Sequence, residues 1–239
     1  MFLKNTLAST AWLVHLIIFI LLCLWGSYSI LKYCDYGYEF LYDVLDINNH
    51  ISEFGPKNYY KSDFEYLTKQ EHVKLFSDIV HGVTASPETL SAITYLNKEG
   101  EAIPLLRTPE VVHLQAVYNL NNAINKIAYL LMSIFIIIGS LIYRLQFSFK
   151  KSEVLGTGLG VISIALLTIW AIGPTAIFYQ FHIWVFPEGH QWFFYYQESL
   201  MSTMMKAPDL FGGIALLIIL LAIPLIAVCW LILNRLYKL

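Results

Sequence analysis

Four long apolar runs constrain the fold of this chain more than any other feature. They cover roughly Ala11–Leu31, Ile124–Leu145, Val154–Ile172 and Gly212–Leu233. An α-helix rises about 1.5 Å per residue, so each run is long enough to cross about 30 Å of hydrocarbon. The sequence therefore predicts an all-α membrane protein with four transmembrane helices.

The composition agrees with this class and excludes others. Apolar residues make up 57% of the chain and charged residues 13%, with a mean hydropathy of +0.59, whereas soluble domains carry about 25% charged residues. A net charge of -2 excludes a nucleic-acid binder that depends on positive charge. The first apolar run is too long for the core of a signal peptide, and no small-residue cleavage site follows it, so we expect an uncleaved anchor.

The placement of basic residues predicts the orientation. Six of the 15 Lys and Arg residues, but only one of the 17 acidic residues, lie at the two termini and in the connection at residues 144–153. Basic residues favour the cytoplasmic side of a membrane. We therefore expect cytoplasmic termini and two outward-facing segments, both rich in the aromatic residues of a membrane interface.

This topology divides the chain into five parts. Residues 1–32 form the N-terminus and first transmembrane helix, and residues 33–123 form the first extracytoplasmic segment. Residues 124–172 contain the second and third transmembrane helices with a short cytoplasmic loop. Residues 173–211 form the second extracytoplasmic segment, and residues 212–239 contain the fourth transmembrane helix and the cytoplasmic C-terminus.

The first extracytoplasmic segment is too long to be a structureless loop. A loose apolar stripe at Ser62–Val80 predicts a helix. The sequence Ser-Pro-Glu at residues 86–88 predicts a helix that ends by Gly100, and Thr-Pro-Glu at residues 108–110 predicts one that continues into the second transmembrane run. Residues 33–60 could form strands or loops. We therefore expect an extracytoplasmic cap of helices plus a small β portion.

Two of the seven histidines stand out as candidates for chemistry. His113 precedes the second apolar run and His182 follows the third, so both lie near headgroup depth on the outer face. Histidine is suited to proton transfer because its ordinary pKa is about 6.5. Taken alone, each fits a structural role better than a catalytic one. If they share a site, both imidazoles should reach one common point.

Two other kinds of chemistry find less support in the sequence. His182, Glu188 and His190 could ligate a metal with His113 as a fourth ligand, but a proline and a glycine interrupt the helix that would align them. A serine hydrolase is disfavoured because no Gly-x-Ser-x-Gly motif is present.

Two short motifs resemble those of a known family. Glu110–Val117 (EVVHLQAV) is similar to E-x-x-H-h-x-D-V, where h is apolar, and Phe181–Phe186 (FHIWVF) is similar to F-H-x-x-x-F. With the four apolar runs, the large first outer segment and the stretch from Trp192 to Phe211, they resemble the lipoprotein intramolecular transacylase (Lit) family of bacterial membrane proteins.

This resemblance implies a specific reaction. Such enzymes move the sn-2 acyl chain of a diacylglyceryl-cysteine lipoprotein to the α-amine of that cysteine and give a lyso-form lipoprotein. It implies that His113 and His182 are the functional histidines and that no metal or organic cofactor is needed. It also implies diacylated bacterial lipoproteins as substrate. We further expect a monomer in the bacterial cytoplasmic membrane, with its active site at the extracytoplasmic face.

The chain departs from the family pattern at one position. Ala116 stands where the motif has an acid, one turn along the helix from His113. Glu110 lies on the same helical face and could replace that acid, or it could be an acid favoured at a helix start. We expect the substrate to contact Glu110, Tyr118, Phe181 and Phe186. Because of Ala116, a non-catalytic protein whose outer lobe binds a partner or a lipid stays an alternative, as does a metal-dependent membrane hydrolase.

Overall fold

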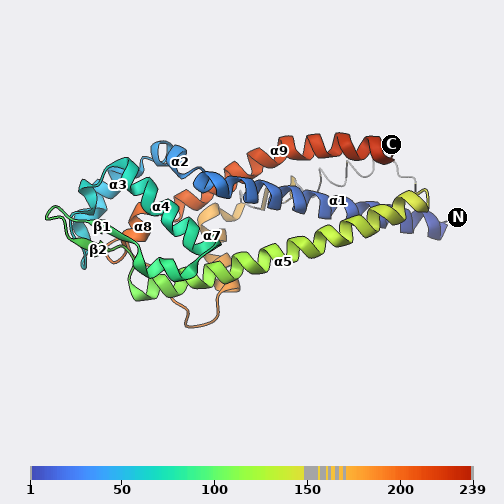
Figure 1. The fold of residues 1–239 in the computed structure, drawn as a ribbon. Coiled ribbons are helices and arrows are strands. Elements are labelled where there is room, and N and C mark those ends of the chain that lie inside the picture. The colour runs from blue at the N-terminus through green and yellow to red at the C-terminus, as the bar shows by residue number, and fades with distance from the viewer. Residues whose placement is uncertain are drawn as a thin grey trace. The chain divides into compact units, whose positions relative to one another are not determined.

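The structure is a computed structural model that describes residues 2–147, 156, 160, 163–164, 167–168 and 171–237. The chain divides into two compact units. The span unit comprises Met1–Ile30, Ile124–Pro174 and Ile218–Leu239, and the cap unit comprises Leu31–Ala123 and Thr175–Leu217. Helices predominate in both, and one small sheet lies in the cap unit (Figure 1). The prediction of a membrane protein with helices and a small β portion is confirmed.

Three described helices are long and apolar enough to cross a membrane. These stretches are Thr6–Val44, Thr108–Arg144 and Asp209–Arg235. They correspond to the first, second and fourth predicted spans. The third predicted span, Val154–Ile172, lies mostly outside the described residues.

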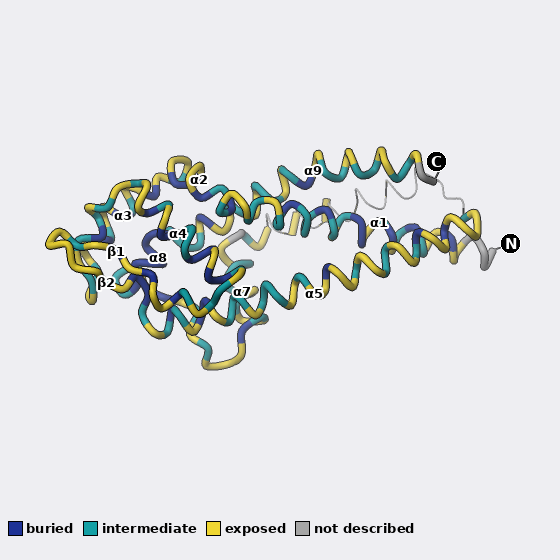
Figure 2. The backbone as a smooth tube through the Cα atoms, viewed as in Figure 1, coloured by how far each residue is buried: buried dark blue, intermediate teal, exposed yellow. Residues whose placement is uncertain are grey.

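Aromatic and amide side chains join the helices of the span unit. Helix α1 (Phe2–Leu31) packs on α5 (Thr108–Arg144), where the Trp25 Nε1–H donates to Asn125 Oδ1 at 3.0 Å. Phe19 of α1 contacts Trp230 of α9 (Asp209–Tyr237), with 6.4 Å between ring centroids. Figure 2 shows that much of the surface of α5 and α9 is exposed or half-buried. Apolar side chains on that surface are what a helix presents to lipid.

The cap unit begins with short helices where strands or loops were expected. Residues 32–57 form the 3-10 helix η1 (Lys32–Gly37), α2 (Tyr38–Val44), α3 (Ile47–Phe54) and the 3-10 helix η2 (Gly55–Lys57), so that prediction is wrong for them, whereas residues 58–60 form a loop. The polar residues that suggested loops stand at the breaks: Asp35 and Asp46 adopt φ values of 46° and 53°. Asp tolerates this left-handed conformation better than most residues.

Helix α4 (Lys69–Thr84) begins at a capping box. The Glu71 N–H donates to Thr68 Oγ1 at 3.3 Å, and the Thr68 N–H donates to Glu71 Oε2 at 2.7 Å. The buried side chains of α4 recur at helical spacing, as the stripe at residues 62–80 predicted. They are His72, Leu75, Phe76, Ile79, Val80 and Val83. The helix begins only at Lys69, however, and the first part of the stripe forms the separate 3-10 helix η3 (Phe64–Tyr66).

The helix predicted after residue 86 is much shorter than expected. The 3-10 helix η4 covers Pro87–Ala92, and the chain then enters strand β1 (Thr94–Leu96), which pairs antiparallel with β2 (Ala102–Pro104). β-Branched and aromatic residues favour a strand there. The hairpin closes at Gly100, which has a φ of 81° and donates its N–H to the Asn97 carbonyl at 3.0 Å.

Aromatic packing fixes the core of the cap unit. Tyr38 is fully buried, stacks on Phe76 with 4.0 Å between centroids, and donates its hydroxyl hydrogen to the Met204 carbonyl at 2.9 Å. Met204 belongs to α8 (Leu200–Met205), whose six side chains are all buried. This core supports the two segments that carry the candidate site, the start of α5 and the chain from α7 (Pro174–Val185) to α8.

Candidate active site

The two histidines singled out by the sequence lie together in the cap unit. His113 is near the start of α5 and only 7% exposed, and His182 is near the end of α7 and half-buried. Their ring centroids are 6.1 Å apart and the ring planes differ by 31°. Two imidazoles at this spacing can both reach one reacting group placed between their edges.

A backbone contact fixes the protonation pattern of the His182 ring. Its Nδ1 lies 2.7 Å from the Phe178 carbonyl oxygen, one turn earlier in α7. A carbonyl only accepts hydrogen bonds, so Nδ1 must carry the hydrogen and the neutral ring keeps its lone pair on Nε2. Burial lowers the pKa of His182 below its usual value, although the bond to Phe178 acts in the opposite direction. His182 therefore has the form of a neutral base.

A third histidine completes the cluster. His190 Nε2 lies 3.3 Å from His113 Nδ1, and the ring centroids are 5.5 Å apart. Sequence reasoning considered His190 only as a metal ligand. Its meeting with His113 depends on the turn at Pro187–Gly189, where the His190 N–H donates to the Pro187 carbonyl at 3.1 Å.

Phe186 lies at the centre of the three imidazoles. It is 8% exposed, and its ring centroid lies 5.0 Å from His113, 5.6 Å from His182 and 5.0 Å from His190. The His190 ring stacks on it with only 13° between planes. Phe186 is one of the predicted substrate contacts. In the structure it packs against the histidines, so it also holds their spacing.

Further aromatic rings enclose the His182 side. Phe178 lies 4.2 Å from the His182 ring centroid, and Trp192 stacks on His182 at 4.8 Å. Phe194, which is buried, lies 6.1 Å from His113. Aromatic walls of this kind exclude water and favour the apolar part of a ligand.

The other two aromatic residues expected to contact substrate lie nearer the surface. Phe181 is 43% exposed and meets the His182 ring edge-on at 5.7 Å. Tyr118 is half-buried on α5. Their contacts with substrate stay a prediction.

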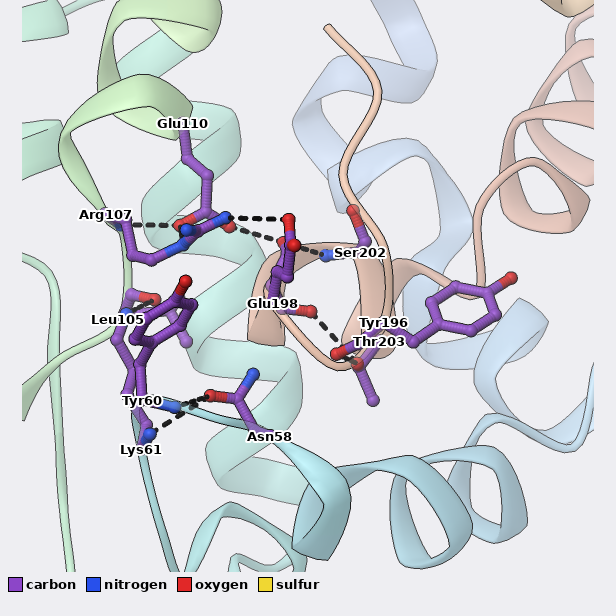
Figure 3. Close-up of polar contacts among 11 residues, drawn as sticks. Asn58, Tyr60, Lys61, Leu105, Arg107, Glu110, Tyr196, Glu198, Ser202 and Thr203 are labelled. Atoms are coloured by element: carbon purple, nitrogen blue, oxygen red, sulfur yellow. Dashed lines mark hydrogen bonds and ion pairs between the residues drawn. The ribbon is translucent and has the colours of Figure 1, made fainter. Parts of the chain in front are cut away.

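Glu110 is fully buried and bonded within the protein (Figure 3). One carboxylate oxygen accepts from the Ser199 hydroxyl, and the other accepts from the backbone N–H of Arg107 at 2.5 Å. The second bond is the acid half of a capping box at the start of α5. The helix-start role considered for Glu110 is thus present, and the bond to Ser199 ties α5 to the start of α8.

Two half-buried cations accompany this carboxylate. The Arg107 guanidinium lies 3.6 Å from Glu110 and 3.9 Å from Glu198, and it covers the Tyr60 ring at 4.8 Å from its centroid. The Lys61 ammonium donates to the Leu105 carbonyl at 2.6 Å. Burial lowers the pKa of Lys61, an effect that the Glu110 charge opposes. Figure 3 shows these groups converging between the start of α5 and the turn before α8.

The alternative of a metal site finds no ligand set here. Among the described residues, no three His, Cys, Asp or Glu side chains are placed to share a metal ion. The histidine cluster instead presents one ring–ring hydrogen bond and one ring–carbonyl hydrogen bond.

Comparisons with known proteins agree on one family. The family model for lipoprotein intramolecular transacylase Lit matches residues 13–207. Among proteins of curated function, none matches the sequence. A solved structure of the membrane integral lipoprotein intramolecular transacylase Lit from Bacillus cereus is similar at a TM-score of 0.65 and 18% identity, covering 98% of this chain and 97% of that one.

Two variants of the Bacillus cereus protein, in which a histidine is replaced by arginine or by alanine, give TM-scores of 0.62 and 0.63 at 18% identity. They cover 98% and 99% of this chain, and 92% and 96% of those chains. At this identity the likeness of the structures supports the fold, and the family model supports the assignment to a family.

Proposed function

The chain belongs to the lipoprotein intramolecular transacylase family and is a membrane-integral enzyme, and from this premise we propose that it moves the sn-2 acyl chain of a diacylglyceryl-cysteine lipoprotein to the α-amine of the same cysteine. The observation that carries the proposal is the pair His113 and His182 at 6.1 Å in an aromatic enclosure. The expected non-catalytic alternative does not fit an enzyme family and is not carried further.

His182 is the base in this proposal. Its Nδ1–H is held by the Phe178 carbonyl, so Nε2 offers a lone pair to an amine proton. A lowered pKa keeps the ring neutral near pH 7 and ready to accept that proton.

His113 is the hydrogen-bond donor to the oxyanion. A neutral imidazole with its hydrogen on Nε2 can stabilise the negative charge that develops on an attacked carbonyl oxygen. Burial of His113 at 7% exposure places this donor away from water, where a charge-directed hydrogen bond is strongest.

His182 and His113 are sufficient to account for every proton and bond in the reaction. The α-amine attacks the sn-2 ester carbonyl, a C–N bond forms, and the amine proton passes to His182 Nε2. When the intermediate collapses, the bond between the carbonyl carbon and the sn-2 oxygen breaks, and the same proton passes from His182 to that oxygen. The products are an amide and a free glyceryl hydroxyl, and both histidines return to their starting forms.

Holding the amine close to the ester supplies much of the remaining rate enhancement. Amine and ester belong to one molecule, so the enzyme needs no covalent intermediate, only a folded substrate conformation. The rings of Phe178, Trp192 and Phe194 around the histidines suit such a conformer of a lipid headgroup. Following the charge asymmetry of the sequence, we place this site at the extracytoplasmic face of the bacterial cytoplasmic membrane, with both termini cytoplasmic.

Expression in a bacterium whose lipoproteins are diacylated with a free amine tests the proposal. The acyl shift leaves the molecular mass unchanged, so N-terminal lipopeptides are treated with mild base before mass spectrometry. Starting material loses two ester-linked chains, whereas the lyso-form loses one and keeps an amide-linked chain.

Substitution at each histidine separates the two roles. We expect His182→Gln to lower the rate by about 10²–10⁴-fold because the base is lost, and His113→Phe by about 10²–10³-fold because the oxyanion donor is lost. His81→Gln, on the exposed side of α4, is the matched control and should keep the full rate. Full lyso-form yield in both site variants would show that the pair does not carry the reaction.

A further inference from the structure

His190 belongs to neither of the two motifs that identify the histidine pair. It follows α7 by one turn of chain, in which Gly189 adopts a φ of 81° and the His190 N–H donates to the Pro187 carbonyl at 3.1 Å. A left-handed conformation of this kind suits glycine. The turn directs His190 back toward α5.

The environment of His190 holds its ring in one orientation. The ring stacks on Phe186 at 5.0 Å with 13° between planes, and Phe186 is itself buried against His113 and His182. Stacking fixes the plane of the imidazole ring. The hydrogen bond to His113 fixes how the ring is turned within that plane. His190 Nε2 therefore faces His113 Nδ1 at 3.3 Å.

This contact gives His113 a partner that its own helix does not provide. One turn along α5, where the family motif has an acid, Ala116 offers only a methyl group. An imidazole with no partner on Nδ1 exchanges between its two neutral tautomers, and only one of them presents a hydrogen on Nε2. A donor facing Nδ1 selects that tautomer.

We propose that His190 is a positioning residue that donates its Nε2–H to His113 Nδ1, and so holds His113 in the tautomer that presents its Nε2–H to the reacting ester. The proposal rests on the proposed function of His113 as oxyanion donor. In this chain, a histidine from the loop after α7 supplies the Nδ1 partner that Ala116 does not.

Two substitutions separate hydrogen bonding from packing. His190→Phe keeps an aromatic ring to stack on Phe186 but removes the hydrogen bond. His190→Gln keeps an amide N–H near the position of Nε2 but is not aromatic. We expect roughly a tenfold fall in kcat for His190→Phe with KM within about twofold, and a smaller fall for His190→Gln. His81→Gln is again the control.

Nitrogen NMR of histidine-labelled protein in lipid gives a readout that is independent of activity. The His113 signals, assigned by their loss in His113→Phe, should show a protonated Nε2 and an unprotonated Nδ1 in the unmodified chain. The same pattern should persist in His190→Gln and become a mixture of tautomers in His190→Phe. A protonated Nδ1 on His113 in the unmodified chain would overturn the proposal, even if neither His190 variant folds.

The two proposals fail in different ways. If His190→Phe keeps the full rate and the His113 tautomer while His113→Phe is inactive, the role of His190 is wrong and the function of the pair stands. If His113→Phe and His182→Gln both keep the full rate, the proposed function itself is wrong.

Discussion

The bond between Ser199 and Glu110 should be one of the strongest single contributions to the stability of the cap unit. The Ser199 hydroxyl donates to the buried Glu110 carboxylate and also accepts from the Ser202 N–H at 2.9 Å as the N-cap of α8. Ser199→Ala removes both bonds and leaves a carboxylate oxygen buried without this donor. A hydrogen bond to a charged group contributes about 1.5–3 kcal/mol, and an N-cap contributes about 1 kcal/mol.

We therefore expect Ser199→Ala to lower the free energy of unfolding by about 3 kcal/mol. For a chain of this size, 1 kcal/mol shifts Tm by about 2–4 °C, so the fall in Tm should be roughly 6–12 °C. Thermal unfolding in detergent, followed by tryptophan fluorescence, measures it.

A matched serine gives the control. Ser52 lies exposed on α3, and its hydroxyl donates to the Asn48 carbonyl at 2.9 Å, so Ser52→Ala should stay within about 0.5 kcal/mol of the unmodified protein. If Ser199→Ala and Ser52→Ala melt at the same temperature, the Glu110–Ser199 bond does not hold α5 to α8.

Other predictions concern the cap unit. Thr68→Ala breaks the capping box of α4 and should lower the free energy of unfolding, measured by chemical denaturation, by about 1 kcal/mol. The hydrogen bond from the Thr68 backbone N–H lowers the pKa of the Glu71 carboxyl. The contribution of Glu71 to the free energy of unfolding is therefore fully present at a pH above the usual pKa of a glutamate, and it should be lost as the pH falls through the lowered pKa. Burial lowers the pKa of His72, so the free energy of unfolding should decline as the pH falls below about 6.5, and this decline should be smaller in His72→Gln, because the other buried histidines still contribute to it. Gly82→Ala places a methyl group against the buried Leu90 side chain and should lower stability by about 1–3 kcal/mol in the same unfolding assay.

Local signals in the sequence were sufficient to predict some helices and strands but not others. The Thr-Pro-Glu start at residue 108 has no helix breaker after it, and α5 runs unbroken from Thr108 to Arg144. The similar Ser-Pro-Glu start at residue 86 yields only η4. Ile93 to Tyr95 favour a strand there, and pairing with Ala102–Pro104 is a tertiary contact that outweighs helix propensity.

The same distinction holds at the candidate site. His113 and His182 could be selected because each stands in a recognisable motif near an apolar run. His190 could not, because its bond to His113 joins residues 77 positions apart through a turn that no local pattern specifies. The Glu110–Ser199 bond spans 89 positions, so the sequence indicated the capping role of Glu110 and not its second partner.

The most direct test of the proposed reaction follows one labelled acyl chain in a purified system. The enzyme in lipid is given two synthetic diacylglyceryl-cysteine peptides of different peptide mass, and only one carries a ¹³C-labelled chain at the sn-2 position. Fragmentation after mild base treatment shows which peptide holds an amide-linked labelled chain. An intramolecular transfer places the label on the α-amine of its own peptide alone, at a rate that His182→Gln lowers at least about a hundredfold. Label on the other peptide, or release of free labelled fatty acid in place of the amide, would contradict it.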